Sequence, residues 1–328
     1  MSTAAPPVVA RPDLGAATRG RRAMRAPSRL RYVARVSAVV VAVLLIAYVG
    51  ISFKYADSLS RVDRHALVRS AAYVAPTHED VRFTTSDGLV LRGWWFAATS
   101  PRQRAVVIVH GKDQDRVDSS FDAGRIARLL LDRGYSALLF DLRGHGESDG
   151  LRWGLGKQEA LDVAAAVDLA AQKAGVPRSR VAIIAESMGA GSAMMALPLI
   201  PDVGPIVLDS VYTSATTVVN EIGPSVSGLP SWFTPGMVLM ARIFFGLDVD
   251  AVVPIQQVRA HPERAFLFIQ CDSDKTVAPH HGAEMKAASA NAGTELWSVQ
   301  GCGHVRAFVT HPAEWEARVT AFLEGQLR

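Results

Sequence analysis

Ser187 stands where a predicted strand gives way to a predicted helix. The apolar, β-branched run Val181–Ile184 is typical of a strand buried on both faces, and small residues lie two positions either side of the serine, at Ala185 and Gly189. In such a tight turn the serine hydroxyl is exposed and can act as a nucleophile. The next backbone N–H, that of Met188, would face the oxygen on which negative charge develops. An ordinary strand-to-helix turn fits the same five residues, so the surrounding elements must decide.

The elements that precede Ser187 alternate between strands and helices. Ala105–Val109 and Ser136–Phe140 are continuous apolar runs that predict buried strands, and each is followed by apolar residues at helical spacing. Repeats of this kind predict a mostly parallel sheet with helices on both faces. The polar segments 110–112 and 141–148 end these two strands, so we expect them to lie with Ser187 at the carboxyl edge of the sheet, where ligands bind.

Charge is distributed unevenly along the 328 residues. The formal net charge is +4, but the first 35 residues carry eight arginines and a single acid, Asp13, so the remainder carries a net charge of −3. A nucleic-acid-binding protein would carry its positive charge on the folded domain, so we expect no nucleic-acid partner. The segment 1–35 is rich in Ala, Pro, Ser and Arg and is predicted to be a disordered cytoplasmic tail.

An uncharged apolar segment, Val36–Phe53, follows the tail and is bounded by Arg35 and Lys54. As a helix it would reach roughly 27 Å, close to the thickness of about 30 Å of a bilayer core. A cleaved signal peptide or a buried core helix is the alternative, but no good cleavage site follows at the right distance. We therefore expect a single-pass signal anchor in the cell membrane that contacts lipid, with its arginine-rich side cytoplasmic and the following domain outside the cytoplasm.

The folded domain is expected to begin at residue 79, after a juxtamembrane linker at 54–78. Two runs of alternating apolar residues flank Ser86-Asp87-Gly88, and an Asp-Gly turn between such runs predicts an antiparallel hairpin. The domain therefore combines a hairpin with the parallel α/β pattern that follows it.

Three strand-end motifs together resemble the α/β-hydrolase superfamily. They are His110-Gly111, the segment Asp-x-Arg-Gly-His-Gly-x-Ser at 141–148, and the turn around Ser187. The resemblance covers residues 79–328 and is greatest to membrane-anchored serine hydrolases of the peptidase-like or esterase-like branch. It implies a mostly parallel, doubly wound α/β sheet with a helical cap inserted at about residues 211–262.

The same resemblance assigns roles to residues near the serine turn. Lys112 occupies the position whose backbone N–H supplies a second oxyanion donor beside that of Met188. Asp141, Arg143 and His145 match a segment that braces the loop, so we expect them to be structural. His145 as a catalytic base is the alternative, but it precedes the serine in the chain.

The catalytic acid follows from the superfamily pattern His-Gly-x-x-Asp-x-x-Val. Aligned on Val277, the pattern places the acid at Asp274, although Gln270-Cys271 replaces His-Gly. Asp272 is two residues too early. Asp209, at the end of the preceding predicted strand, remains the rival.

His304 is the expected general base. It follows glycine on the loop after the last predicted strand, Thr294–Val299, and the order Ser187, Asp274, His304 is the one that α/β hydrolases use. His304 would take the proton of Ser187, Asp274 would fix the tautomer of the imidazole, and water would resolve the acyl-enzyme.

We therefore expect a serine hydrolase that cleaves an ester, thioester or amide bond in a small-molecule or acyl substrate. An acyltransferase on the same three residues is an alternative that differs only in what resolves the acyl-enzyme. A non-catalytic membrane-anchored binding protein is another, but it would be expected to have lost part of the triad. No His, Cys and Asp group has metal-ligand spacing, so we expect neither a metal nor a cofactor.

An apolar cluster lies within the predicted cap. We expect these side chains to pack the cap onto the domain, with the lining of an acyl-chain pocket as the alternative. The cluster comprises Trp232, Phe233, Met237, Met240, Phe244 and Phe245.

Cys271 and Cys302 are the only two cysteines in the chain. If Asp274 reaches His304, the two loops lie side by side and both cysteines converge near the triad. A domain outside the cytoplasm lies in a compartment that permits oxidation. We therefore expect a Cys271–Cys302 disulfide, with two buried thiols as the alternative.

Overall fold

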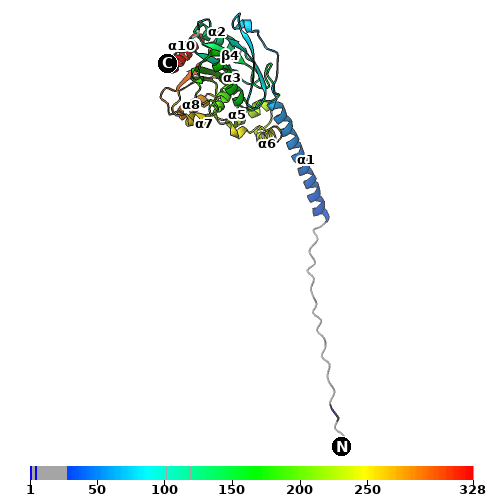
Figure 1. Ribbon diagram of the computed structural model, residues 1–328. Helices are drawn as coiled ribbons and strands as arrows, with labels where there is room; N and C mark the ends of the chain where they lie inside the picture. Colours follow the sequence, from blue (N-terminus) through cyan, green and yellow to red (C-terminus); the bar gives the residue numbers. More distant parts are fainter. Residues whose placement is uncertain (2–3, 6–27, 101, 118–119, 328) are drawn as a thin grey trace. The chain divides into compact units, whose positions relative to one another are not determined.

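The computed structural model describes residues 1, 4–5, 28–100, 102–117 and 120–327, and the chain divides into two units, Met1–Ala47 and Tyr48–Arg328. Most of the tail expected at 1–35 lies outside the described residues. Residues 28–35 are helical, because helix α1 spans Ser28–Ser60 (Figure 1). Within the described part of the chain, α1 is the one helix that is long and apolar enough to cross a membrane, with a mean hydropathy of 2.6.

Eight strands of the second unit form one sheet in the order β1-β2-β4-β3-β5-β6-β7-β8. Strand β2 pairs antiparallel with β1 and β4, and the other neighbours pair parallel, which confirms the predicted hairpin and the mostly parallel sheet. The strands are β1 Glu79–Thr84, β2 Val90–Phe96, β3 Ala105–Val109, β4 Ser136–Phe140, β5 Val181–Glu186, β6 Ile206–Asp209, β7 Phe266–Cys271 and β8 Glu295–Val299.

Helices cover both faces of this sheet, which explains why its central strands are apolar without alternation. Along β3, Val106 and Ile108 enter one hydrophobic core, and Val107 and Val109 enter the other. The first core is closed by α2 Ala123–Asp132, α9 Ala307–Thr310 and α10 Pro312–Gln326. The second is closed by α3 Glu159–Ala174, α4 Ser187–Ala196, α7 Pro254–Ala260 and α8 His280–Ala288.

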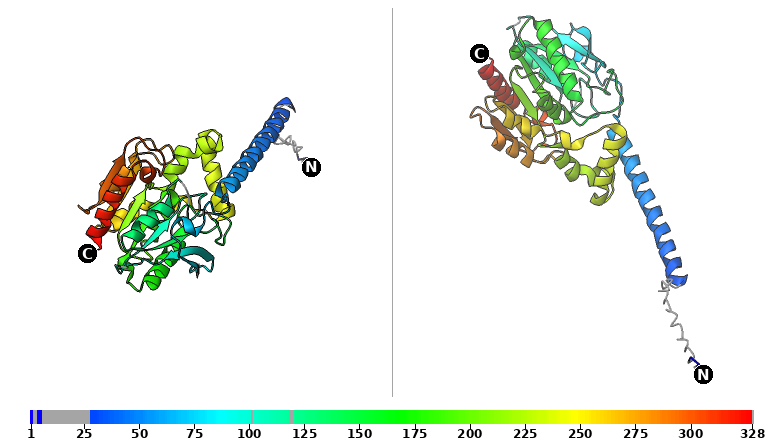
Figure 2. Two further views of the ribbon diagram at one scale, coloured as in Figure 1. Left: turned by 90° about the horizontal axis from the view of Figure 1, so that it is seen from above. Right: turned by 60° about the horizontal axis from the view of Figure 1, so that its bottom comes forward.

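A helical insertion follows β6, where the cap was predicted. It consists of α5 (Ala215–Ser227) and α6 (Thr234–Phe245), which Figure 2 shows in yellow-green beside the last turns of α1. Helix α7 packs against α4 and α8, so the last part of the predicted insertion belongs to the helical layer on the sheet. Short 3₁₀ turns at Ala71–Tyr73, Arg178–Arg180, Ser231–Phe233 and Val249–Ala251 complete the described elements.

The structure differs from the expected linker at 54–78. Helix α1 continues to Ser60, and the following residues pack on the domain. The Arg64 guanidinium donates to the backbone carbonyls of Gly146, Ser148 and Gly150. Ala71 and Val74 are buried in the first core. The folded domain therefore includes residues that precede β1.

Candidate active site

The turn at Ser187 joins β5 directly to α4. Ser187 has a φ of 49°, a left-handed conformation that costs a non-glycine residue energy and recurs at functional sites. The turn is pressed against the end of β3, because a Cβ on Gly189 would lie 2.8 Å from the carbonyl oxygen of Val109. Glycine is therefore required two residues after the serine, and the packing holds the Ser187 side chain at the carboxyl edge of the sheet.

His304 lies between Ser187 and Asp274. Its Nε2 is 2.9 Å from the Ser187 Oγ, and its Nδ1 is 2.7 Å from the Asp274 Oδ2. Because a carboxylate only accepts, Nδ1–H donates to Asp274 and Nε2 is left to accept the serine proton. The three predicted residues are thus brought together from β5–α4, the loop after β7 and the loop after β8.

Asp274 is buried and held by its own loop. Its Oδ1 accepts hydrogen bonds from the amides of Thr276 and Val277, at 2.8 and 2.9 Å. Burial alone would raise the pKa of Asp274, but the hydrogen bond and charge of His304, together with these amides, hold the pKa below its ordinary value. The carboxylate is therefore ionised at neutral pH and can orient the imidazole.

The rival acids have other partners. Asp209 is fully buried at the end of β6, where its Oδ1 accepts from the Ser210 hydroxyl, and burial raises its pKa to about 7. Ser210 in turn accepts from the amide of Val305, next to the histidine. Asp272 accepts from the Gly301 amide. Neither carboxylate has a described hydrogen bond to His304, so the geometry favours Asp274 as its partner.

The loop after β3 approaches the serine from the other side. A Cβ on Gly111 would lie 3.4 Å from that of Ser187, and the Gly111 amide donates to the buried Glu186 Oε1 over 3.0 Å. Lys112 follows, with its ammonium paired with Asp113 and 5.2 Å from the centroid of the Trp153 ring. The side chain of Lys112 thus has partners of its own while its backbone belongs to the loop beside Ser187.

Glu186 was not predicted as a site residue from the sequence, although its side chain contacts the loop beside Ser187. Its signal in the sequence is a lone charge at the end of an otherwise apolar strand, directly before the serine. Its hydrogen-bond partner is a backbone amide 75 residues earlier, which no side-chain pattern reveals.

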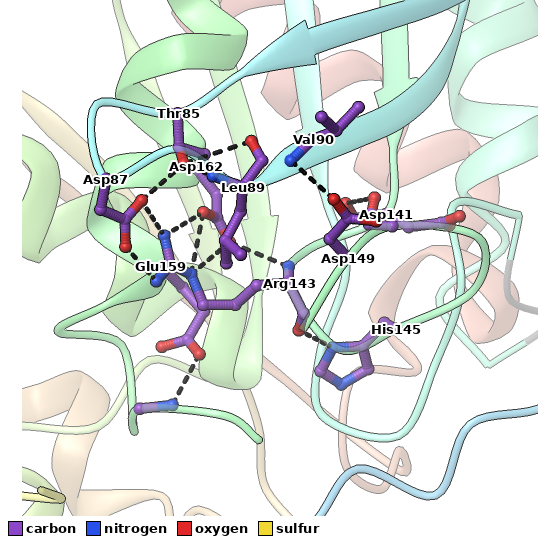
Figure 3. Close-up of polar contacts among 12 residues, drawn as sticks. Thr85, Asp87, Leu89, Val90, Asp141, Arg143, His145, Asp149, Glu159 and Asp162 are labelled. Carbon is purple, nitrogen blue, oxygen red and sulfur yellow. Dashed lines mark hydrogen bonds and ion pairs between the residues drawn. The ribbon is translucent and has the colours of Figure 1, made fainter. Parts of the chain in front are cut away.

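His145 and Arg143 form part of a buried polar network behind the loop (Figure 3). The Arg143 guanidinium donates to Asp162 and Asp87, and His145 donates from Nδ1 to the Arg143 carbonyl and accepts at Nε2 from the Asp113 amide. Burial lowers the pKa of His145 to about 3, so this ring is neutral at neutral pH. Both ring nitrogens are thereby occupied within the loop, which fits the predicted structural role and not that of a base.

Asp141 anchors the other side of the same network. Its carboxylate accepts from the Arg116 amide and guanidinium and from the Glu147 amide. Burial alone would raise the pKa of Asp141, but the charge and hydrogen bonds of Arg116 lower it below its ordinary value. These contacts fix the loops that end β3 and β4 against each other.

Cys271 and Cys302 are joined by a disulfide, with their Cα atoms 5.2 Å apart. The bond links the end of β7 to the loop that carries His304. A backbone hydrogen bond of 3.1 Å from Ser273 to Cys302 ties the same two loops. The loops of the acid and of the histidine are therefore connected covalently, as the cysteine positions led us to expect.

Glu221, His280 and His281 form the one group in the described chain that could hold a metal ion, with ligand atoms within 4.8 Å of one another. No metal-ligand group was expected from the spacing of these residue types in the sequence. The Glu221 carboxylate bridges the two histidines, because its oxygens lie 2.9 Å from Nε2 of His280 and 3.1 Å from Nε2 of His281. They link α5 of the cap to α8, which begins shortly after Asp274.

A family model described as serine aminopeptidase, S33, matches residues 100–244. The esterase Pf2001 of Pyrococcus furiosus is 25% identical, with a TM-score of 0.67, and the match covers 81% of this chain and all of that one. The α/β hydrolase GrgF of Penicillium, at 19% identity and a TM-score of 0.60, shares the fold over 76% of this chain and 99% of its own.

Among curated proteins, Rv2307c of Mycobacterium tuberculosis is 36% identical over 152 residues, which are 46% of this chain. The chain spans about half the length of that relative, 52%. YfhR of Salmonella typhi is 26% identical over 61% of this chain and 68% of its own length. The polyketide transferase grgF of Penicillium is 44% identical over 71 residues, 22% of this chain and 23% of its own. The chain belongs to the α/β-hydrolase superfamily, whose esterase-like members support a hydrolase activity.

Proposed function

We propose that this α/β hydrolase is a serine hydrolase that cleaves an ester, thioester or amide bond through an acyl-enzyme. Ser187 is the nucleophile, His304 the general base and Asp274 the acid that orients it. The observation that carries the proposal is the continuous chain of hydrogen bonds from Asp274 through His304 to Ser187, at 2.7 and 2.9 Å. A serine hydroxyl is a weak nucleophile unless a positioned base removes its proton, and this arrangement supplies one.

The reaction proceeds in two steps. His304 Nε2 takes the Ser187 proton as Oγ attacks the carbonyl carbon, and the protonated imidazole then gives that proton to the leaving group. A water molecule enters, His304 removes its proton as the water oxygen attacks the acyl carbon, and the bond from that carbon to Ser187 Oγ then breaks. The protonated His304 returns the proton to Ser187 Oγ, which releases the free acid and regenerates the enzyme. Asp274 stays ionised throughout and stabilises the positively charged imidazole.

The Met188 and Lys112 amides hold the oxyanion in both steps. Met188 directly follows the nucleophile at the start of α4, and Lys112 follows Gly111, which packs beside Ser187. Removing one such donor costs roughly 3 kcal/mol of transition-state stabilisation in other enzymes. The bond from Gly111 to Glu186 supports this placement of the loop.

The enzyme is anchored to the membrane by α1, with its catalytic domain outside the cytoplasm. The uncharged segment Val36–Phe53 lies within α1, and the arginines precede it. An uncleaved anchor is supported by burial at its end and just after it, because Ser52, Ala56 and Ser60 are all buried. Arg152 pairs with Asp57 of the same helix. Cleavage by a signal peptidase within this part of α1 would remove buried residues from the domain.

An ester is the bond that we favour, since the solved relative Pf2001 is named an esterase. An acyltransferase with the same triad is the second candidate, favoured by the relative that is named a polyketide transferase. A non-catalytic binding protein would not require Ser187, His304 and Asp274 to be hydrogen-bonded in this order.

The test is a partition experiment with the full chain in detergent. A nitrophenyl ester is supplied with increasing concentrations of an alcohol or a thiol, and free acid and transferred product are measured. We expect release of nitrophenol and free acid as the main product. Transferred product as the main outcome would favour the acyltransferase. The absence of turnover with any ester, thioester or amide offered would contradict the proposed function.

A further inference from the structure

Helix α6 of the cap packs on the last turns of α1. The Tyr48 ring stacks on Phe233 and Trp232, with ring centroids 5.1 and 5.6 Å apart, and the Tyr48 hydroxyl donates to the Trp232 carbonyl. Further along α1, Phe53 meets Phe244 edge to face at 5.1 Å. Both Tyr48 and Phe53 belong to the proposed membrane span, so α6 lies at the depth at which the span leaves the bilayer.

The two helices approach closely. A Cβ on Gly236 of α6 would lie 2.6 Å from the Tyr48 hydroxyl oxygen, so the contact depends on the absence of a side chain there. Glycine and other small residues at a crossing let two helix backbones come together. This contact is therefore a built interface between the cap and the span.

Helix α6 and the turn before it also expose large apolar side chains, some of them beside the contact with α1. We define the cap face as Trp232, Leu239, Ile243 and Phe244, whose exposed fractions are 60%, 51%, 61% and 58%. Helix α6 contains no acidic residue and a single basic one, Arg242. An apolar side of this kind, with tryptophan at its edge and a cation nearby, is typical of a helix that lies in the boundary between lipid headgroups and acyl chains.

An apolar cavity of about 100 Å³ opens between the same elements. Its wall includes Ala56 and Leu59 of α1, Val238 of α6, and Trp153 and Leu155 of the loop before α3. The indole N–H of Trp153 donates to the Leu59 carbonyl, so the loop is bound to α1.

Two wall residues connect the cavity to the active site. Trp153 lies beside the Lys112 side chain, and Lys112 belongs to the proposed oxyanion loop. The Leu155 carbonyl accepts from the Tyr212 hydroxyl, and a Cβ on Gly191 of α4 would collide with Tyr212. The cavity thus lies between the end of the membrane span and the helix that begins at Ser187.

We propose that the cap face of α6 is embedded in the outer bilayer boundary beside α1, and that the cavity receives the acyl chain of a membrane-resident ester. This inference rests on the proposed function and deepens it by naming the substrate class, an acyl lipid that enters from the bilayer. The scissile carbonyl reaches Ser187 while the chain stays against apolar side chains, so the chain leaves lipid for protein without crossing water. Exposed Lys54 and Arg242 are placed to face anionic headgroups.

The position of the cap face is tested by tryptophan quenching. The full chain and its Trp232→Phe variant are reconstituted in phosphatidylcholine vesicles that contain lipid brominated near the headgroup or near the acyl terminus. The difference between the two proteins isolates the emission of Trp232. We expect stronger quenching of that difference by the shallow bromines. A difference that neither lipid quenches would overturn the membrane position of the cap, and so would failure of the protein to float with the vesicles.

Esters that differ in the length of the acyl chain test whether the cavity binds that chain. Val238→Phe fills the wall of the cavity, and Val226→Phe adds the same side chain at an exposed position of α5 outside it. For decanoyl and acetyl esters of one alcohol, we expect Val238→Phe to lower the ratio of kcat/KM, decanoyl over acetyl, by about tenfold or more. Val226→Phe should leave the ratio unchanged.

The outcomes separate this inference from the proposed function. If the wild type hydrolyses both esters and Val238→Phe leaves their ratio unchanged, the cavity is not the acyl site and the hydrolase assignment stands. If the wild type hydrolyses neither ester and resists fluorophosphonate labelling, the proposed function itself fails.

Discussion

The Gly111 amide donates a hydrogen bond of 3.0 Å to Oε1 of Glu186, the residue that precedes the proposed nucleophile. Glu186 is fully buried, and its backbone is the last of β5. One side chain therefore fixes the distance between the serine turn and the loop that carries Lys112. The proposed oxyanion site needs this distance to be constant, because donors stabilise the transition state only when they are already in place.

Glu186→Ala should lower kcat on the order of 10²-fold, the loss caused by removing one oxyanion donor, while changing KM little. Glu186→Gln keeps an acceptor oxygen for the Gly111 amide and should restore most of the activity. Steady-state kinetics with a soluble ester, together with thermal unfolding of each variant, provides the measurement. Equal losses in both variants would mean that Glu186 acts through its charge and not by holding the loop.

Asp274→Asn should lower kcat on the order of 10⁴-fold, as losing the acid of a triad does elsewhere, because the amide favours the wrong imidazole tautomer. Asp209→Asn is the matched control, since Asp209 lies buried behind the histidine loop without a described bond to His304. We expect a much milder loss there. A larger loss in Asp209→Asn than in Asp274→Asn would identify Asp209, at the end of β6, as the catalytic acid.

The folded state should lose stability as the pH falls, because His145 is held neutral in the folded chain. Its pKa is about 3 in the folded chain against an ordinary value of 6.5. Between these values the unfolded chain binds a proton that the folded chain does not, so this stabilisation is complete above pH 6.5 and decreases on acidification. The slope is at most about 1.4 kcal/mol per pH unit.

The measurement compares the wild type with His145→Gln in urea unfolding from about pH 7 to about pH 5. The advantage of the wild type should narrow as the pH falls. An advantage that is independent of pH would show that His145 titrates alike in both states.

Reduction of the Cys271–Cys302 bond should destabilise the domain by roughly 3–4 kcal/mol, the chain-entropy cost for a loop of about this length. The bond spans 31 residues and connects the acid loop to the histidine loop. Urea unfolding of a Cys271→Ser/Cys302→Ser double variant, compared with the wild type before and after reductant, gives the number. If the urea midpoint of the wild type were the same with and without reductant, the bond would not form in the protein.

The sheet and the three hydrogen-bonded residues were predictable because each leaves a local mark. Buried strands such as Ala105–Val109 are continuous apolar runs. Ser187 lies two residues before a glycine and His304 directly after one, and each follows a predicted strand. The assignment of Asp274 required a family pattern, since Asp209 has an equally plausible position along the chain.

Other features depend on contacts that no local pattern records. Arg64 was assigned to a linker because its partners are backbone carbonyls more than eighty residues away. Glu221 meets His280 and His281 only because the cap folds α5 against α8. In each case a long-range hydrogen bond decides the role of the residue, and no local sequence pattern links the two partners.

The central claim is that Ser187 forms the covalent intermediate. The direct measurement is intact-mass analysis after treatment with a fluorophosphonate, for the wild type and for Ser187→Ala, with peptide mapping of the modified residue. We expect one phosphonyl group on the peptide that contains Ser187 in the wild type, no modification in Ser187→Ala, and loss of ester turnover in that variant with unchanged thermal unfolding. Labelling or turnover that persists in a folded Ser187→Ala protein would contradict the account.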